Sequence, residues 1–250
     1  MREFFKIFIV FALFFLAGCD KIKDEKKLVV ATSADFPPYA FKGQNNEIEG
    51  IDIEIAKEIA ARLNLNVAIK NMPFDTIIDS VASGKADIGI NGITVIEERK
   101  KSINFSKTYD TSKQAIVVKE NSQIKNINDL YDKKAKYKVG VQTASTGALY
   151  FQYDIANKNL ASSIVEYQNG LDTAADLLAD KIDCIIIDLE QANSFVKKNK
   201  GLKILETKYV EEEYAIVVNK DKLKLLDGIN MVLEDMKLDG TIEKIRNKYM

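Results

Sequence analysis

Short apolar runs alternate with amphipathic stretches in the first half of the chain. Strand-like runs lie at residues 28–31, 66–69 and 87–90. Between them, apolar residues recur at helical spacing at 52–63 and at 77–84. Asp52 is placed to cap the first of these helices, and the second ends at Gly84. Strands alternating with helices in this way predict parallel βαβ units with helices on both faces of a sheet.

The same alternation restarts in the second half of the chain. Strand-like runs lie at residues 114–118, 138–141, 164–167, 185–187 and 214–218, and helical patterns cover 172–180, 222–237, 241–249 and a stretch that begins near Thr146. The repetition, with a last strand that returns, predicts an α/β protein of two lobes joined by two crossings. We expect lobe 1 at 28–110 and 214–250, lobe 2 at 115–206, and hinge segments at 111–114 and 207–213. No repeat with a period of about 20–50 residues is visible, which excludes a solenoid.

The first 18 residues have a different pattern. A charged start leads into an apolar run that ends in small residues before Cys19. This order is typical of a secretory signal that is too short to be a spanning helix. Residues 16–19 (LAGC) also resemble a bacterial lipobox, which implies that residues 1–18 are removed and that lipid is attached to Cys19. Residues 19–27 then form a charged tether. An ordinary signal peptide is the alternative.

Composition narrows the possible functions. The formal net charge is −1 and no segment combines basic with aromatic residues, so nucleic acid is not expected as a partner. The chain contains no histidine, which removes the commonest general base and the usual metal ligand. We therefore expect no cofactor and no metal, and a binding role gains weight. Cys184 is the only other cysteine, so no internal disulfide forms if Cys19 carries lipid, and its apolar neighbours predict a small buried side chain.

Polar residues follow the strand that ends near residue 90. In parallel α/β sheets, ligands bind beyond the carboxyl ends of the strands. Gly92 allows close backbone approach there, and Thr94 and Glu97 have the spacing of a capping box. Arg99 falls in the first turn of the next helix, where it could pair with a ligand carboxylate beside the helix amides. The spacing alone also fits a solvated helix residue.

Three further features leave a ligand role and a structural role open. The turn at residues 142–147 offers hydroxyl groups at a helix start, which either bind an anion or simply cap the helix. Asp188 follows a buried apolar strand and needs a partner, which a ligand ammonium, a helix N-terminus or a buried lysine would provide. Phe36 and Phe74 lie in turns after strands, where aromatic rings either stack on a ligand or pack in the core.

Seven segments, in this order, resemble the solute-binding proteins of polar amino-acid ABC transporters. They are residues 31–41, 50–54, 83–87, 92–99, 104–109, 139–147 and 185–188. The resemblance implies an α/β, two-lobed periplasmic-binding-protein-like (type II) fold, in which each lobe has a mixed, mainly parallel sheet flanked by helices. It also implies a monomer without enzyme activity that captures a free polar amino acid and delivers it to an ABC permease and its ATPase. With lipid on Cys19, the protein would work outside the cytoplasm at a membrane, in the periplasm or at the cell surface.

The resemblance assigns roles to the residues that meet the charged groups of the ligand. It implies that Arg99 binds the α-carboxylate, assisted by Thr94 and Thr146. It implies that Asp188 binds the α-ammonium, together with the backbone carbonyl of Gly92. A zwitterion requires such a fork of donors and a separate carboxylate.

A second group of residues is expected around the ligand side chain. By the same resemblance, Phe36 and Phe74 enclose this side chain, and its selectivity is set around Ser33, Asp35, Asn91 and Gln142. Ser33 stands where several binders of basic amino acids carry an acid, which weakens an arginine or lysine assignment, although Asp35 could compensate in part. Gln142 suits a polar side chain without specifying one.

Two positions depart from the family pattern. Ile96 stands where Thr or Ser is common, so the pair formed by Thr94 and Glu97 is expected to replace the usual helix cap. Ala144 stands where Gly is common, which could change the local turn.

Two other functions fit the same fold. One is an enzyme that resembles cyclohexadienyl dehydratase, in which carboxylates, lysines or tyrosines would have to transfer protons in the absence of histidine. The other is an amino-acid-sensing surface lipoprotein that feeds no permease. The pair of Arg99 and Asp188 suits an unreacted amino acid, which favours the transport protein.

Overall fold

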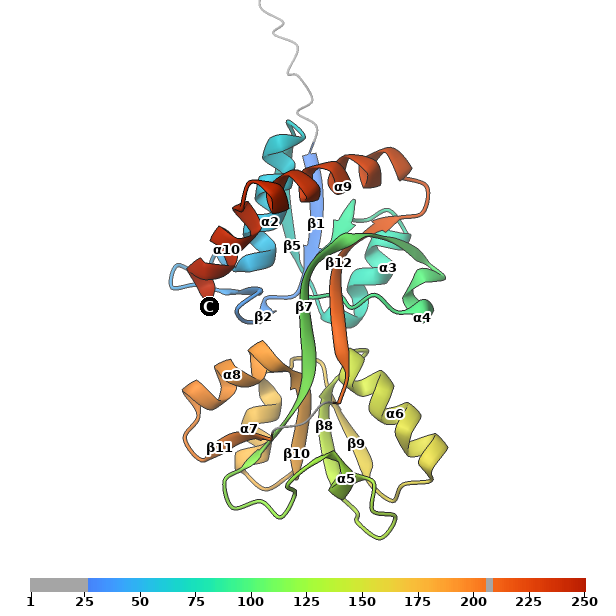
Figure 1. The fold of residues 1–250 in the computed structure, drawn as a ribbon, viewed down its shortest axis with the longest axis vertical. Coiled ribbons are helices and arrows are strands. Elements are labelled where there is room, and N and C mark those ends of the chain that lie inside the picture. Colours follow the sequence, from blue (N-terminus) through green and yellow to red (C-terminus); the bar gives the residue numbers. More distant parts are fainter. Residues whose placement is uncertain (1–26, 206–208) are drawn as a thin grey trace, which may run out of the picture.

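The computed structural model describes residues 27–205 and 209–250. Two lobes lie one above the other and are joined by two long strands between them (Figure 1). The described chain begins and ends in the upper lobe, lobe 1, and its middle part forms the lower lobe, lobe 2. The predicted signal peptide (1–18), Cys19 and most of the predicted tether lie outside the described residues, as do residues 207 and 208 of the predicted second crossing.

Lobe 1 contains the first and the last elements of the chain. Its strands are β1 (Lys27–Thr32), β5 (Asn66–Asn71), β6 (Ile88–Gly89), the first part of β7 (Ile103–Lys119) and β12 (Glu211–Asn219). Its helices are α2 (Ile51–Arg62), the 3-10 turn η1 (Phe74–Thr76), α3 (Ile77–Ala82), α4 (Glu97–Lys100), α9 (Leu223–Leu238) and α10 (Thr241–Tyr249). A small antiparallel sheet is formed by β2 (Asp35–Phe36), β3 (Ala40–Lys42) and β4 (Ile48–Glu49).

Lobe 2 is built from the middle of the chain. Its strands are the second part of β7, β8 (Lys138–Gln142), β9 (Ser163–Tyr167), β10 (Cys184–Asp188) and β11 (Leu202–Leu205). Its helices are α5 (Ile127–Leu130), α6 (Thr146–Lys158), α7 (Asp172–Leu178) and α8 (Leu189–Lys198).

The main sheet passes through both lobes in the order β5-β1-β6-β12-β7-β10-β8-β9, with β11 paired to β7. In lobe 1, β1 is parallel to β5 and β6, and in lobe 2, β8 is parallel to β9 and β10. Strands β12 and β7 are antiparallel to each other. In lobe 1, β12 is antiparallel to β6, and in lobe 2, β7 is antiparallel to β10 and β11. The predicted α/β architecture with mixed sheets is therefore confirmed, and the antiparallel pair marks the connection between the lobes.

Strand β7 carries the chain from lobe 1 to lobe 2 without interruption. Its first part pairs with β12, and its last part pairs with β10 and β11. The predicted crossing at 111–114 therefore lies inside one continuous strand of 17 residues. Opposite it, Glu211 pairs with Lys113 and Glu213 pairs with Thr111. Residues 111–114 and residues 211–213 of the two crossings are extended strands, and register shifts in β12 follow at residues 214–217.

The prediction that Asp52 caps α2 is wrong. The helix follows Gly50 and has no side-chain cap, because the carbonyl groups of Pro38 and Tyr39 accept hydrogen bonds from the first amides of the helix at 3.1 and 2.9 Å. The Asp52 carboxylate is fully buried and accepts a hydrogen bond of 2.8 Å from the backbone N–H of Gly92 instead. Asp52 therefore fixes the loop that contains the predicted ligand residues.

The capping box predicted for α4 is also wrong. Ile96 is the N-cap residue and provides no side-chain cap. The Thr94 hydroxyl donates to Glu212 at 2.8 Å, whereas Glu97 forms a salt bridge with Lys100 at 2.6 Å on the exposed side of the helix. The two residues therefore point in different directions, and Thr94 is directed toward the hinge.

Apolar clusters cover both faces of the sheet. In lobe 1, Val218 packs with α2 and α9, whereas Val217 packs with α3 on the opposite face. In lobe 2, Cys184 is completely buried in an apolar cluster, and burial raises the pKa of its thiol. The prediction of a small buried side chain is confirmed. Within 27–205 and 209–250, the helices are too short or too polar to cross a membrane, and no cluster of potential metal ligands is found.

Gly50 provides a test of this packing. Its φ is +131°, and a Cβ atom would lie 2.2 Å from the Tyr39 carbonyl oxygen. We expect Gly50→Ala to lower the free energy of unfolding by about 3 kcal/mol or more, because strain and backbone overlap add. Gly84→Ala is the matched control: its φ is +75° but nothing lies within 4 Å, so it should cost about 1 kcal/mol. Equal losses in chemical denaturation would contradict this account of the α2 start.

Candidate functional site

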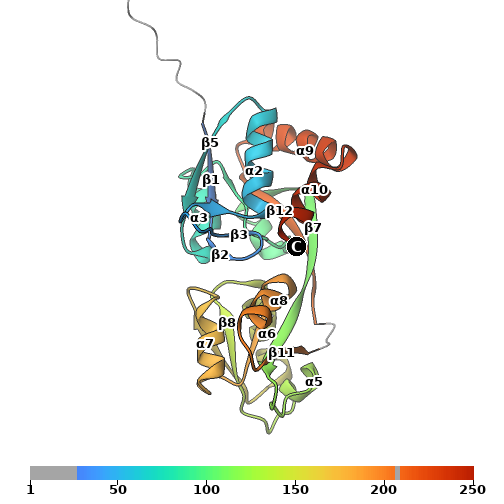
Figure 2. The same ribbon diagram turned by 90° about the vertical axis from the view of Figure 1, so that its left-hand side faces the viewer.

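The predicted ligand residues lie where the two lobes meet. The strands β7 and β12 run along one side of this junction (Figure 2). Thr94 and Arg99 come from the loop before α4 and from α4 itself, in lobe 1. Thr146 begins α6 and Asp188 ends β10, both in lobe 2. The charged and hydroxyl groups predicted for one ligand therefore come from both lobes.

Strand β12 holds the loop of lobe 1 in place. The Val95 N–H donates to the Glu213 carbonyl, and the Ala215 N–H donates to the Ile93 carbonyl, each at 3.0 Å. These bonds set Thr94 opposite β12 in an isolated bridge. The loop is thus an extension of the hinge sheet, which explains how a residue of lobe 1 reaches the groups of the hinge.

Arg99 is buried between the lobes, with 6% of its surface exposed. Its Nη1 donates to the carbonyl of Thr94, and its Nη2 donates to the carbonyl of Ala144 in lobe 2, both at 3.0 Å. The guanidinium carbon also lies 5.6 Å from the centre of the Phe74 ring. The alternative of a solvated helix residue is therefore wrong.

The electrostatics of Arg99 depend on two carboxyl groups. Burial lowers the pKa of Arg99 to about 10, and the charges of Glu212 and Asp188 oppose this change. The guanidinium remains a cation at neutral pH. Within the described residues the guanidinium contacts neutral carbonyl groups and forms no salt bridge, so the buried cation is suited to hold an anion such as a ligand carboxylate.

The turn before α6 combines a helix cap with a contact between the lobes. Ser145 is the N-cap residue, and its hydroxyl accepts a hydrogen bond of 3.2 Å from the Ala148 N–H. The Thr146 hydroxyl donates to the Thr94 hydroxyl at 2.8 Å. Ala144 adopts φ = +59°, a conformation that glycine adopts more easily, and its carbonyl points to Arg99. Alanine in place of the family's common glycine at residue 144 therefore leaves the turn in place but strains its backbone.

Asp188 has a partner that the sequence did not suggest. Its carboxylate accepts a hydrogen bond from the Tyr214 hydroxyl of β12, and it makes no cap hydrogen bond to the following helix. Burial raises the pKa of Asp188. The group thus lies at the hinge, between a strand of lobe 2 and a strand of lobe 1.

Glu212 is a central residue of the site that sequence reasoning missed. It is 3% exposed, and its two oxygens accept hydrogen bonds of 2.8 Å from the Thr94 hydroxyl and from the Gln114 side-chain amide. Burial and the adjacent Asp188 carboxylate raise the pKa of Glu212 well above its usual range. This residue connects the loop of lobe 1, strand β7 and the end of β10.

The signal that could have identified Glu212 is strand alternation. Three glutamates precede the apolar run of β12, and such a charge run suggests a solvated segment. In a strand, successive side chains point to opposite faces. Glu211 and Glu213 are indeed exposed, and only the middle glutamate points inward.

Asp35 is a second buried carboxylate, 7% exposed, on the lobe 1 side of the junction. Its Oδ2 accepts hydrogen bonds from Gln142 at 2.8 Å and from the Gly170 N–H at 3.3 Å, both in lobe 2. Its Oδ1 is buried without a hydrogen-bond partner among the described residues. Burial raises the pKa of Asp35. Gln191, which was not predicted, donates to the Asp35 backbone carbonyl at 2.8 Å.

The remaining predicted residues pack in the wall of lobe 1. The Asn91 amide donates to the Ser33 carbonyl at 3.0 Å, and Asn91 Oδ1 is buried without a partner in the described part of the chain. Phe36 is buried and stacks on Tyr39 with a ring-centre distance of 5.1 Å. Gly92 has φ = +55°, and a Cβ atom there would lie 2.4 Å from the Phe36 ring. Phe36 therefore belongs to the core of lobe 1, whereas Phe74 lies against Arg99.

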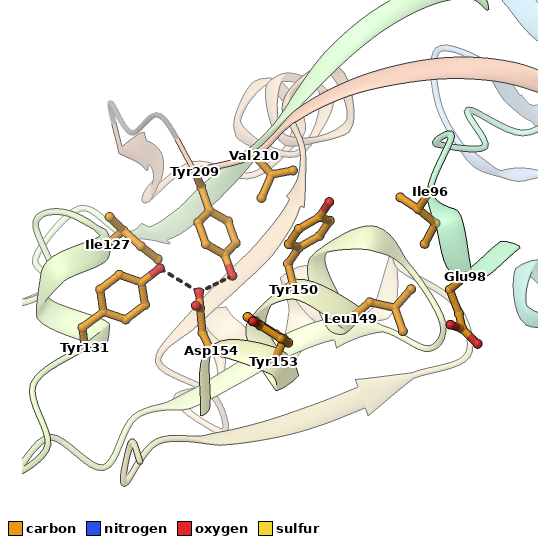
Figure 3. A pocket seen from close by; sticks show the side chains of 10 residues that line it. All are labelled: Ile96, Glu98, Ile127, Tyr131, Leu149, Tyr150, Tyr153, Asp154, Tyr209 and Val210. Carbon is orange, nitrogen blue, oxygen red and sulfur yellow. Dashed lines mark hydrogen bonds between the residues drawn. The ribbon is translucent and has the colours of Figure 1, made fainter. Parts of the chain in front are cut away.

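Two cavities near the junction have different chemical character. One of about 540 Å³ is lined by Ser33, Asp35 and residues of both lobes such as Asn71 and Gln168. The other, of about 660 Å³, contains none of the predicted ligand residues (Figure 3). Tyrosine and aliphatic side chains line it, and the Tyr131 and Tyr209 hydroxyls donate to Asp154 at 2.7 and 2.9 Å. Of the predicted ligand residues, only Ser33 and Asp35 line the first cavity.

Comparison with known proteins shows the family and the fold of this chain. The family of bacterial extracellular solute-binding proteins, family 3, matches residues 28–250. The chain belongs to this family. Its fold is the type II fold of periplasmic binding proteins, as predicted.

Relatives of this solute-binding protein are known in several bacteria. The arginine-binding extracellular protein ArtP of Bacillus subtilis (strain 168) is 31% identical over 231 residues, which cover 90% of this chain and 86% of ArtP. The L-cystine-binding protein TcyJ of Escherichia coli (strain K12) is 28% identical over 92% of this chain and 85% of its own length. A solved structure of an ancestral arginine-binding protein bound to arginine is 38% identical, with a TM-score of 0.82 and coverage of 90% of this chain and 98% of that one.

These findings decide between the functions left open by the sequence. This solute-binding protein is the substrate-binding component of an amino-acid ABC importer and not an enzyme. The roles predicted for its individual residues, and the boundaries of its lobes and hinge, stay predictions.

Proposed function

We propose that this protein binds a cationic polar L-amino acid, with arginine as the preferred ligand, in the cleft between its lobes. The observation that carries the proposal is the buried Arg99, which contacts lobe 2 and faces carboxyl groups from other elements. An amino acid presents one anion and one cation on the same carbon atom. Arg99 is suited to the α-carboxylate and Asp188 to the α-ammonium, with the Thr94 and Thr146 hydroxyls as further polar partners.

The preference for a cationic side chain rests on Asp35. One of its carboxylate oxygens is held by Gln142 and Gly170. The other is buried without a hydrogen bond of good geometry in the described chain, although the nearby Ser33 hydroxyl lowers the pKa of the carboxyl group. A buried carboxylate oxygen is costly unless it is paired, and a guanidinium or ammonium group would pair it. Asp35 thus supplies the acid that Ser33 does not. The arginine-binding relatives agree with this choice.

Delivery requires that the permease recognise the closed protein. Hydrogen bonds already join the lobes, from Thr146 to Thr94 and from Gln142 to Asp35. A ligand held by residues of both lobes favours this arrangement, because only the closed state makes both sets of contacts. We assign lobe 1 to 28–110 and 214–250 and lobe 2 to 115–206, with bending at 111–114 and 207–213.

Binding of the charged groups can be tested by titration calorimetry with L-arginine. We expect Arg99→Ala and Asp188→Ala each to raise the dissociation constant at least about tenfold, because each leaves a ligand charge unpaired at a buried site. Lys100→Ala is the matched control, since Lys100 lies beside Arg99 on α4 but is exposed. Its affinity should stay unchanged. Near-normal affinity in either site variant would contradict the site, and absence of binding by the wild-type protein would contradict the ligand.

Ligand preference can be tested at Asp35. We expect Asp35→Asn to weaken binding of L-arginine by about tenfold or more, because a charge-assisted hydrogen bond is lost. L-glutamine has no side-chain charge, so its affinity should change much less and the ratio of the two affinities should fall. The measurement is calorimetry with both amino acids on both proteins. An unchanged ratio would place the side-chain subsite elsewhere.

We also propose that the protein is held at a membrane face by lipid on Cys19. The support is the order of a charged start, an apolar run and the LAGC sequence at residues 16–19, together with the extracellular character of the family. A receptor that hands a small solute to a membrane protein benefits from being kept close to it. The tether at residues 20–27 would reach about 25 Å if fully extended.

The anchor can be tested by detergent phase partition of the protein expressed in bacteria. We expect Cys19→Ser to move the protein from the detergent phase to the aqueous phase, because the thiol that carries lipid is lost. Cys184→Ala is the control and should stay in the detergent phase, since Cys184 is buried in lobe 2. A wild-type protein found only in the aqueous phase would show an ordinary secreted form.

A further inference from the structure

Two carboxyl groups, the buried Glu212 and the half-buried Asp188, share one cation at the hinge. Glu212 lies on β12 and Asp188 at the end of β10, and both lie beside Gln114 of β7, which donates to Glu212 and pairs with Asp188. Arg99 is the cation whose charge interacts with both. In the described part of the chain, the other groups that bond to the pair are uncharged donors, namely Thr94, Gln114 and Tyr214.

The charges of Arg99, Glu212 and Asp188 balance only if one of the two carboxyl groups carries a proton. With both carboxyl groups ionised, the cluster of Arg99, Glu212 and Asp188 carries a net negative charge in a site removed from water. Two carboxylates in contact cannot both ionise readily, and one proton between them makes the cluster neutral. Glu212 then donates to the Asp188 carboxylate, which leaves Asp188 as the anion for a ligand ammonium.

Residues of both lobes cover the pair in the closed protein. Glu212 is held to the loop of lobe 1 through Thr94, whereas Asp188 belongs to lobe 2. Gln114 of β7 donates to Glu212 and pairs with Asp188, which keeps both residues in one hinge sheet. Moving Thr94 and Arg99 away from lobe 2 would admit water to both carboxyl groups. In water, a glutamate ionises with a pKa of about 4.3. Closure thus buries a group that is ionised at neutral pH in the open protein.

We propose that closure of the lobes on the ligand takes up one proton, which is held between Glu212 and Asp188. This inference rests on the proposed function, because amino-acid binding drives the closure. The ligand does not supply the balancing charge. Its α-ammonium lies beside Asp188 and its α-carboxylate beside Arg99, so the two groups cancel within the cluster. Glu212 is a positioning residue here, which holds Asp188 and Thr94 through its protonated carboxyl group.

The sign of the pH dependence follows from this assignment. The closed state binds more protons than the open state between the ordinary pKa of glutamate and the raised pKa of Glu212. Affinity should therefore fall as pH rises through this window, by up to about tenfold per pH unit for one linked proton. Asp52, whose pKa burial raises to about 7, bonds within lobe 1 to Gly92, so closure leaves its surroundings unchanged.

The test is calorimetric titration of the full chain with L-arginine between pH 5 and 8, about the range in which a raised carboxyl group titrates. Each pH is measured in two buffers of different ionisation enthalpy, which gives the number of protons taken up. We expect proton uptake by the wild-type protein, and we expect Glu212→Gln to bind arginine with no uptake and a flat pH profile. Glutamine keeps the shape of the protonated carboxyl group and does not titrate.

Glu213→Gln is the matched control, because Glu213 lies on the same strand but is exposed. It should keep the wild-type proton uptake and pH profile. Binding by the wild-type protein without proton uptake would overturn the inference and leave the proposed function intact. Uptake that persists in Glu212→Gln would overturn the assignment to this pair. If Glu212→Gln does not fold, the number of protons that the wild-type protein takes up on binding still tests whether closure is linked to proton uptake. Absence of arginine binding at every pH would overturn the proposed function and this inference together.

Discussion

Burial of the Arg99 guanidinium is the constraint on which the junction of the lobes depends. Removing a charge from water is expensive unless carboxylates and hydrogen-bond acceptors replace the water. No single element provides them: one carbonyl acceptor lies in the loop of lobe 1, another in the turn before α6, and the carboxyl groups come from β10 and β12. The cation is therefore satisfied only when lobe 1, lobe 2 and the hinge are in the relative positions of the closed protein.

The hinge strands make this arrangement possible. Strand β7 is continuous between the lobes, and β12 lies antiparallel to it, so the two crossings share one set of backbone hydrogen bonds. Because side chains alternate along β12, Glu212 and Tyr214 both point toward the junction, whereas Glu213 between them is exposed. The same strand binds the loop that carries Thr94. A change in the angle between the lobes must therefore act directly on the ligand residues.

Local periodicity predicted most of the helices and strands, because the spacing of apolar residues along the chain reflects which side of each element is buried. The start of α2 was mispredicted because carbonyl groups from another turn bind its first amides, which leaves Asp52 free to fix Gly92. Family resemblance placed Arg99 and Asp188 at one junction. Glu212 was missed because its burial depends on pairing with β7 and on contact with lobe 2, and neither is visible in a run of three glutamates.

Asp35 and Glu212 show two ways in which a buried carboxyl group can be neutralised. Glu212 is buried against another carboxyl group, which suits a proton, although the two hydrogen bonds that it accepts favour its ionised form. Asp35 has one oxygen bound by lobe 2 and one without a partner in the described chain, which suits a cation. If Glu212 is neutral, Arg99, Asp188 and Asp35 together carry one net negative charge. A ligand with one net positive charge, such as arginine, makes the closed site neutral, whereas glutamine leaves the charge of Asp35 unbalanced. Discrimination between the two ligands then follows from charge balance as well as from shape.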